Sequence, residues 1–305
     1  MTTIETTAPS PAAPAPALRS IGTARRVKNW LATVLVTLAF CVAVVPLAWL
    51  LTTVLTRGYR AILRANWWQK SLKGVLPEQF AGGVYHAIYG TLVQGLVCAV
   101  IAVPIGVLTA IYLVEYGERG RLARVTTFMV DILSGVPSIV AALFVFAVWI
   151  STFGFSQSAL AVSLALVLLM LPVIVRSSEE MLRLVPDELR EASYALGVPK
   201  WKTIVRIVLP TALSGMVTGV MLALARVMGE TAPVLVLVGY SRSINYDILD
   251  GNMASIPLLI YTELTNPEEA GVQRVWGAAL TLIIVIMFFN LLATIISRLS
   301  AVQSR

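Results

Sequence analysis

The sequence carries little charge for its length. Only 13% of its 305 residues are Asp, Glu, Lys or Arg, whereas about a quarter is usual in a soluble globular protein. Apolar residues make up 58% of the chain, and its mean hydropathy is +0.84. A soluble core cannot absorb so much apolar sequence, so part of the surface must face lipid. The composition excludes an ordinary soluble domain and predicts an all-α membrane protein.

Residues for metal binding, disulfides and nucleophilic catalysis are also scarce. Cys41 and Cys98 both lie in apolar runs, and His86 is the sole histidine. With no Cys and His cluster, we predict no metal site and no catalytic residue. The chain also has no G-x-x-x-x-G-K-[ST] phosphate loop. Any ATP hydrolysis must therefore come from another polypeptide.

The charge of the chain is positive, with a formal net value of +7. A basic protein can bind nucleic acid, but here Lys and Arg stand between apolar runs. This pattern favours anionic lipid headgroups and membrane topology signals, so we expect a lipid bilayer as partner and no nucleic acid.

Six apolar runs approach or exceed the roughly 20 residues that a spanning helix needs. They cover residues 30–55, 84–114, 125–150, 157–175, 208–238 and 274–297. Prolines inside or near the ends of these runs predict a packed bundle with bends. The sequence therefore predicts six transmembrane helices.

These runs suggest four segments along the chain. We predict a disordered cytoplasmic tail, a first transmembrane helix with its extracytoplasmic loop, a five-helix core, and a short cytoplasmic C-terminus. They span residues 1–28, 29–83, 84–298 and 299–305. The tail is rich in Ala, Pro and Thr and cannot bury enough surface to fold. The run at 30–55 is too long for a signal peptide and is predicted to be retained.

Lys and Arg counts indicate the orientation. With the N-terminus inside, the inner segments hold fifteen of these residues and the outer segments seven. This excess predicts that both termini are cytoplasmic. The predicted outer loop 57–73 holds five of the seven and argues the other way.

The most informative polar segment is the predicted inner loop 185–210. Pro186 and the acidic residues after it suit a helix start, and Gly197 followed by Pro199 suits a helix stop. We predict a short helix over 186–196, about 16 Å long. Such a helix suits docking into a groove on a partner, or it is a solvated connector.

This loop resembles the EAA motif of ABC-importer permeases. The motif is E-A-A, three residues, Gly, nine residues, then Ile-x-Leu-Pro. Here it reads Glu191, Ala192, Ser193, Gly197, Ile207, Leu209 and Pro210. Every spacing matches, and only Ser193 departs, replacing an alanine. The resemblance implies that residues 186–199 form a coupling helix seated on an ATPase. The residues of this coupling are then Glu191, Ala192, Ser193, Gly197 and Pro199.

Further stretches resemble the phosphate branch of these permeases. They are VPIGVLTAIYLVEYG at 103–117, DILSGVPSIV at 131–140 and GETAP at 229–233. The resemblance implies the type I ABC-importer permease (MetI-like) fold in a bacterial plasma membrane. It implies a homologous permease partner, two ATPase subunits that hold ATP and Mg, and an extracytoplasmic phosphate-binding protein. No cofactor is expected on this chain.

Arg226 and Glu230 stand in the middle of the apolar run 208–238. A charge at mid-bilayer costs about 2.5–3.5 kcal/mol, so it persists where it pairs or works. In one continuous helix the two would share a face with Gly215, Gly219 and Ala223. We expect Arg226 to face the substrate path and Glu230 to neutralise it while the path is empty. The alternative is a structural ion pair that never meets substrate. The small residues either admit a neighbouring helix closely or leave room for an ion.

Four more residues are candidates for the path. Asp131 either pairs with a basic residue across the bundle, near Arg226 or in the inner loop, or is an acid near a helix start. Ser134 and Ser138 flank a small, bent segment that suits a gate or is a packing kink. Thr231 follows the charged pair, where Gly229 and Pro233 disturb the helix.

Two other functions stay open. A permease for another oxyanion, such as sulfate, molybdate or phosphonate, shares the architecture. Sulfate and molybdate permeases typically carry G-E-F-G-A where this chain has G-E-T-A-P. An intramembrane enzyme using Glu230 or Asp131 needs a second catalytic group at membrane depth. The acidic loop 239–273 is a candidate docking surface for the binding protein or an ordinary exposed loop.

Overall fold

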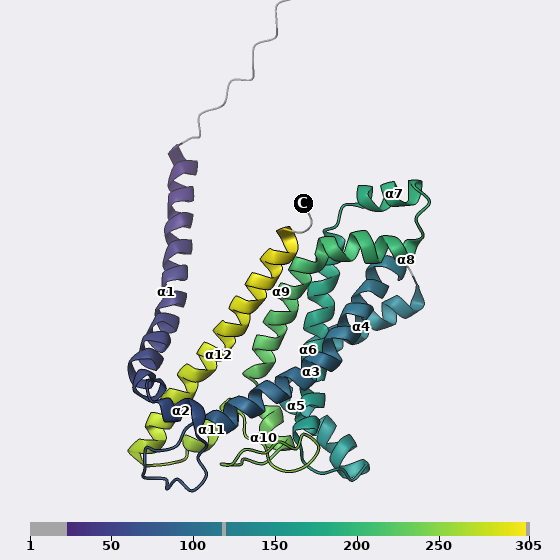
Figure 1. The fold of residues 1–305 in the computed structure, drawn as a ribbon. Coiled ribbons are helices and arrows are strands. Elements are labelled where there is room, and N and C mark those ends of the chain that lie inside the picture. The colour runs from purple at the N-terminus through teal and green to yellow at the C-terminus, as the bar shows by residue number, and fades with distance from the viewer. Residues whose placement is uncertain (1–22, 118–119, 303–305) are drawn as a thin grey trace, which may run out of the picture. The chain divides into compact units, whose positions relative to one another are not determined.

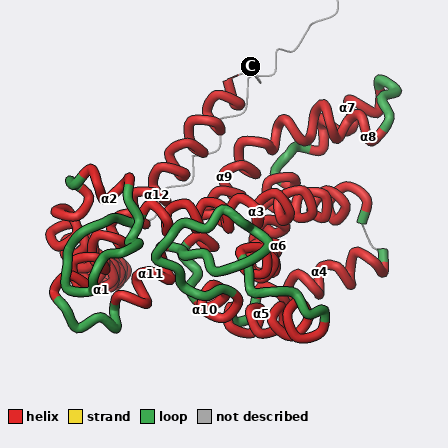
Figure 2. Tube along the Cα trace, turned by 60° about the horizontal axis from the view of Figure 1, so that its bottom comes forward, coloured by secondary structure: helices red, strands yellow, loops and turns green. Residues whose placement is uncertain are grey.

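The structure is a computed structural model that describes residues 23–117 and 120–302 (Figure 1). Helices joined by loops make up this part of the chain, and no strand occurs in it (Figure 2). The α-helices are α1 (Thr23–Ile62), α2 (Ala65–Gln69), α3 (Tyr85–Ile111), α4 (Arg121–Ser134), α5 (Ser138–Val145), α6 (Ala159–Arg183), α7 (Asp187–Ala195), α8 (Lys200–Thr203), α9 (Leu209–Met228), α10 (Ala232–Leu237), α11 (Ile256–Glu263) and α12 (Glu269–Val302). Three π-helical segments continue helices, namely η1 (Tyr112–Tyr116), η2 (Phe146–Thr152) and η3 (Ile204–Val208).

The chain divides into two units, one ending at Thr53 and the other starting at Val54. The described part of the first unit is the beginning of α1, a continuous helix in spite of Pro46. The predicted tail falls mostly on residues 1–22, which lie outside the described residues; residues 23–28 are the first turns of α1. The second unit holds the rest of the chain and the candidate sites.

The prediction of an all-α membrane protein is confirmed, and the described residues hold five or six candidate spans where six were predicted. Among the described residues, five continuous helical stretches are long and apolar enough to cross a membrane. A sixth span is formed if α4 and the helix from Ser138 to Thr152 count as one, although they meet at 108°.

Besides the run 125–150, which is bent between α4 and α5, two predicted runs differ from the helices that form. The run 208–238 is not one helix, because α9 ends at Met228 and α10 starts at Ala232. Pro233 lacks an N–H and its ring clashes with a preceding carbonyl, so together with Gly229 at the end of α9 it favours a break at this point. The run 157–175 continues to Arg183, because the charged residues of its last turns pair with one another.

α6 forms the centre of the second unit. Two-thirds of its most apolar window, 67%, is buried, against 28% or less for the other continuous spans. It packs against α3 on one side and α9 on another, and α9 also packs against α12. The Ser158 side chain starts α6 by accepting a hydrogen bond from the Ala161 N–H at 3.4 Å.

The two ends of the second unit carry different short helices. α7 and α8 lie at one end, and α2, α10 and α11 lie at the other (Figure 1). The sequence assigns α7 and α8 to the cytoplasmic side. The bundle therefore holds a candidate coupling surface at one end and a loop-rich surface at the opposite end.

Candidate functional site

Arg226 and Glu230 do not lie on one helical face. Arg226 stands in the last turn of α9 and is exposed, whereas Glu230 follows the helix end at Gly229 and is half-buried. The two form no ion pair among the described residues. The expectation of a neutralised pair on one continuous helix is therefore wrong for this conformation. The break at Gly229 removes the four-residue geometry on which it depended.

The small residues before Arg226 face α6. Gly215 and Gly219 lie so close to it that a methyl group on either would overlap Met181 or Ser177. Ala223, next on this stripe, is 1% exposed. The stripe therefore serves close packing of α9 on α6, and leaves no room for an ion between these two helices.

Glu230 lines a small cavity between α3, α6, α9 and α10. Thr91 and Gln94 of α3 and Ser255 share this cavity. The Gln94 side chain is 2% exposed, and its amide nitrogen has no hydrogen-bond partner. An unpartnered buried donor is costly, so Gln94 stands out in a cavity that is otherwise lined largely by apolar side chains. Gln94 was not singled out from the sequence, because it is a single polar residue within an apolar run.

Asp131 finds its partner on α6. Its carboxylate forms an ion pair with the guanidinium of Arg176, which also donates to Glu179 at 2.8 Å. Glu179 in turn accepts from Arg183 at 2.6 Å. The predicted pairing across the bundle is thus observed, and the partner is Arg176. Sequence reasoning missed this ladder, although 176, 179 and 183 have the spacing of one helical face.

The remaining predicted path residues stand at helix breaks. Ser134 ends α4, and its hydroxyl donates to the Asp131 carbonyl at 2.7 Å. Ser138 starts α5 after the 108° bend. Thr231 precedes α10, which packs against α5. Asp131, Ser134 and Ser138 thus gather near α6, while Arg226, Glu230 and Thr231 surround the break after α9.

The candidate coupling loop is a helix, a glycine turn and a second helix. Gly197 has φ +74°, a conformation that side chains with a Cβ rarely adopt. Pro199 precedes α8. Ser193 is buried and its hydroxyl lies 2.8 Å from that of Thr203. The departure from the usual alanine therefore adds a hydrogen bond between the two arms of the loop.

Arg190 fastens this loop to the bundle. Its guanidinium donates to Glu115 at 2.9 Å and to Asp187 at 3.0 Å. It also donates to the backbone oxygens of Leu182 and Val185, at 3.0 and 2.7 Å. Glu115 is 5% exposed, so the pair is shielded from water. Sequence reasoning missed both partners.

The outer surface of the loop offers apolar side chains to a partner. Glu191 and Ala192 are exposed there, and Leu196 is 83% exposed. A cavity of about 360 Å³ beside it is lined by Arg183, Asp187, Arg190, Tyr194 and Lys200. Exposed apolar residues next to charges are typical of a protein interface.

The opposite end holds a buried ion pair. Arg274 and Glu263 are 1% and 2% exposed and meet at 2.9 Å. Arg274 also donates to the backbone oxygens of Leu76 and Gln79. The pair therefore ties the loop before α3 to α11 and α12. Glu263, expected in an acidic docking loop, is buried and takes no part in such a surface.

His86 and Tyr240 lie near this pair. His86 is 1% exposed, and its ring meets that of Tyr240 edge-on at 6.4 Å between centroids. Burial raises the pKa of the Tyr240 hydroxyl, so Tyr240 stays neutral. His86 is thus packed inside the protein.

Comparison with known proteins places the chain in a family. The family described as "Binding-protein-dependent transport system inner membrane component" matches residues 102–301. "Phosphate transport system permease protein PstA 1" of Mycobacterium tuberculosis (strain ATCC 25618 / H37Rv) is 71% identical over 89% of this chain and 88% of its own length. The PstA of Mycobacterium leprae (strain TN) is 69% identical over 90% of each chain. The PstA of Pasteurella multocida (strain Pm70) is 36% identical over 89% of this chain and 95% of its own.

Solved structures share the fold at low identity. A chain of the alginate ABC transporter, solved with an alginate-bound periplasmic protein, has a TM-score of 0.63 and 14% identity. The match covers 89% of this chain and 95% of that one. A chain of the inward-facing MetNI methionine ABC transporter has a TM-score of 0.58 and 22% identity, over 72% and 94%. The chain therefore belongs to the binding-protein-dependent transport system inner membrane components and, within them, to the PstA-type phosphate transport permeases.

Proposed function

We propose that the chain is the permease subunit of an ATP-driven importer of inorganic phosphate, and that it forms half of the translocation path. The choice of phosphate as substrate rests on the names of similar proteins. Relatives between 71% and 36% identical are all named phosphate transport system permeases. These matches cover about nine-tenths of the chain. The chain itself moves substrate and leaves ATP hydrolysis to a partner.

The coupling loop supports an ATPase as that partner. As a permease of a binding-protein-dependent importer, the chain works with a cytoplasmic ATPase and an external binding protein. We infer a heterodimer with a homologous permease, two ATPase subunits that bind ATP and Mg, and both termini in the cytoplasm. The exposed residues Glu191, Ala192 and Leu196 meet the ATPase in this arrangement.

Arg226 is the proposed phosphate contact in the path. It is exposed on α9 and forms no ion pair among the described residues, so its guanidinium is available. A guanidinium donates two parallel hydrogen bonds to an oxyanion. A homologous subunit facing α9 would close the path around this group.

Glu230 acts in this proposal through the break at Gly229. Rotation there changes the distance between Glu230 and Arg226, so the carboxylate neutralises Arg226 in one conformation and leaves it free in another. Thr231 moves with Glu230. The half-buried position of Glu230 beside Gln94 supports this role, because it holds the carboxylate away from the exposed guanidinium here.

Arg176 is a second cation for the path. Asp131 and Glu179 share its charge, and the Arg176 side chain is 35% exposed. An arriving phosphate competes with Asp131 for the guanidinium, so the contact is weak enough to be released. Ser134 and Ser138 flank the bend beside Asp131 and line the same part of the path.

Reconstitution tests this function. The complex with its partner subunits, placed in proteoliposomes with the binding protein outside, should hydrolyse ATP faster when phosphate is added. Sulfate and molybdate should give no stimulation. Stimulation by either of these and not by phosphate would favour the other oxyanion permeases. The intramembrane enzyme has no comparable support, since the described residues around the Glu230 cavity include no second acid or base.

A further inference from the structure

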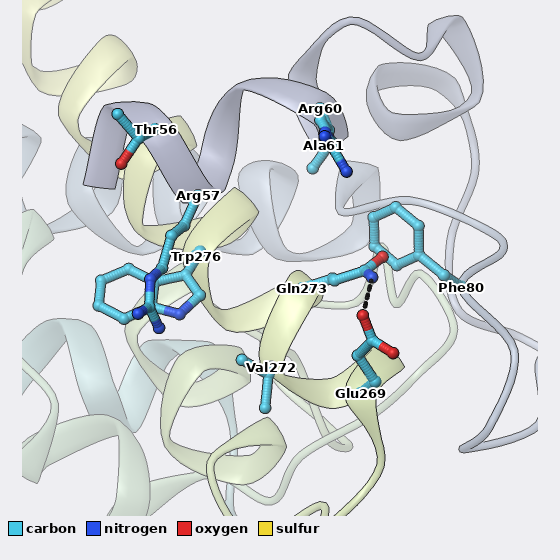
Figure 3. A pocket seen from close by; sticks show the side chains of 9 residues that line it. All are labelled: Thr56, Arg57, Arg60, Ala61, Phe80, Glu269, Val272, Gln273 and Trp276. Carbon is cyan, nitrogen blue, oxygen red and sulfur yellow. Dashed lines mark hydrogen bonds between the residues drawn. The ribbon is translucent and has the colours of Figure 1, made fainter. Parts of the chain in front are cut away.

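A charged cavity lies where the end of α1 meets the start of α12. It has a volume of about 250 Å³ and is drawn in Figure 3. Its lining includes Arg57, Arg60 and Ala61 of α1 and Glu269, Gln273 and Trp276 of α12. The proposed translocation path and the coupling loop share no residue with it.

Tight helix packing fixes the walls of this cavity. A Cβ on Gly58 would lie 2.6 Å from the backbone oxygen of Trp276. One on Gly277 would lie 2.5 Å from the Cβ of Ala61. Trp67 closes the contact by donating its indole N–H to the Thr281 hydroxyl at 2.9 Å. The cavity is therefore preformed.

The cavity presents two guanidinium groups without a carboxylate partner. Arg57 lies over the ring of Trp276, 5.3 Å from its centroid, as Figure 3 shows. Arg60 donates to the Tyr59 hydroxyl at 3.2 Å. Neither arginine forms an ion pair with any residue in the described part of the chain. Their donors remain open to an anion.

The acidic residue of the cavity is held apart from the arginines. Glu269 accepts a hydrogen bond from the Gln273 amide at 3.1 Å, one helical turn away (Figure 3). The cavity therefore combines a cationic wall on α1 with a single carboxylate on α12. Its net charge of about +1 suits a monoanion that also carries a hydroxyl donor.

The cavity lies at the depth of lipid headgroups. The apolar run of α1 ends just before Arg57, and the apolar run of α12 begins just after Gln273. Leu55, two residues before Arg57, is 54% exposed. Trp276 at this level is typical of the membrane interface. An acyl chain can therefore follow the apolar surface while its phosphate reaches the arginines.

We propose that this cavity binds the headgroup of an anionic phospholipid. Arg57 and Arg60 bind the phosphodiester, and Glu269 accepts a hydrogen bond from a headgroup hydroxyl, as in phosphatidylglycerol. The bound lipid joins the end of α1 to the start of α12. This site is independent of what the path transports.

Native mass spectrometry of the detergent-solubilised complex tests the site. Phosphatidylglycerol, phosphatidylethanolamine and phosphatidylcholine with the same acyl chains are added in turn to delipidated protein. We expect phosphatidylglycerol to be retained best. Arg57→Gln with Arg60→Gln should weaken its binding about thirty-fold, since two basic contacts near a membrane surface are lost.

The matched control is Lys70→Gln with Lys73→Gln, which removes the same charge from two exposed residues of the following loop. It should leave lipid binding unchanged. Equal loss in the control, or no loss in the arginine variant, overturns the proposal. If the double variant does not fold, Arg60→Gln alone should still weaken binding about five-fold.

A competition experiment distinguishes binding of a lipid headgroup from binding of free phosphate. Millimolar inorganic phosphate should not displace phosphatidylglycerol, because it brings no acyl chain. Displacement that depends on Arg57 and Arg60 would make the cavity a site for free phosphate and contradict the lipid assignment.

Discussion

At the scale of single residues, the few charged side chains of the membrane segments fall into two groups. Asp131, Arg176 and Glu179 neutralise one another at the end of α6. Arg226 stands exposed with no such partner among the described residues. A lone charge in a membrane segment is costly to keep. We therefore expect a different consequence from removing each kind of charge.

Arg226→Gln should abolish phosphate uptake and leave assembly intact. The glutamine keeps much of the side-chain volume and loses the paired donors that hold an oxyanion. Uptake of labelled phosphate into proteoliposomes measures the first effect, and co-purification of the partner subunits measures the second. Arg124→Gln, at another exposed arginine, should retain uptake. If Arg226→Gln transports normally, Arg226 has no place in the path.

At the scale of elements, the two breaks decide where the candidate site lies. One separates α4 from α5 at 108°, and the other separates α9 from α10 around Glu230. Besides these two breaks, the turn at Gly197 reverses the chain between α7 and α8 in the candidate coupling loop. Its positive φ is a backbone requirement that can be tested separately from side-chain contacts.

Gly197→Ala should weaken the coupling of ATP hydrolysis to transport. The space around this residue is open, so any effect comes from backbone strain of about 1–2 kcal/mol. Asn tolerates the left-handed conformation better than Ala, so Gly197→Asn is the matched variant and should stay close to the parent. Substrate-stimulated ATP hydrolysis is the measurement. Equal activity of both variants would show that the turn is not strained.

How far the sequence predicts these elements depends on which interactions set them. The six spans and the coupling helix follow from hydropathy, from Pro186 and from Gly197, which act locally. The Asp131–Arg176 and Arg190–Glu115 pairs are different, because they join residues far apart in the chain. Hydropathy alone also misplaced the end of α9. Gly229 and Pro233 indicated a break at this point, but the prediction of one span followed the continuous apolar run instead.

At the scale of the whole second unit, buried ion pairs join segments that hydropathy cannot assign to one another. Arg274 holds Glu263 and two carbonyls of the loop before α3 in a site that water does not reach. Removing one member of such a pair leaves a buried charge without compensation. The loop-rich end should therefore depend on this pair for its stability.

Arg274→Met should destabilise the protein by about 3–5 kcal/mol, because buried Glu263 loses its close partner and keeps only Arg242 at 4.0 Å and the Asn266 amide at 3.2 Å. Adding Glu263→Gln should recover part of this loss, since the amide is neutral. Thermal unfolding in detergent, followed by tryptophan fluorescence, compares the two variants. If Arg274→Met is as stable as the parent, Glu263 is compensated without Arg274, by Arg242, by solvent or by protonation.

Arg190 also links the coupling loop mechanically to the end of α6. Its guanidinium donates to the carbonyl of Leu182, in the last turn of α6, and to that of Val185, just after this helix. The short helix α7 is thereby a cap on α6 and not a free arm. If an ATPase subunit docks on α7, as proposed, its movement acts directly on α6, the most buried span of the described residues. Because α6 also carries Arg176, the same helix would link the coupling loop to the second cation of the proposed path.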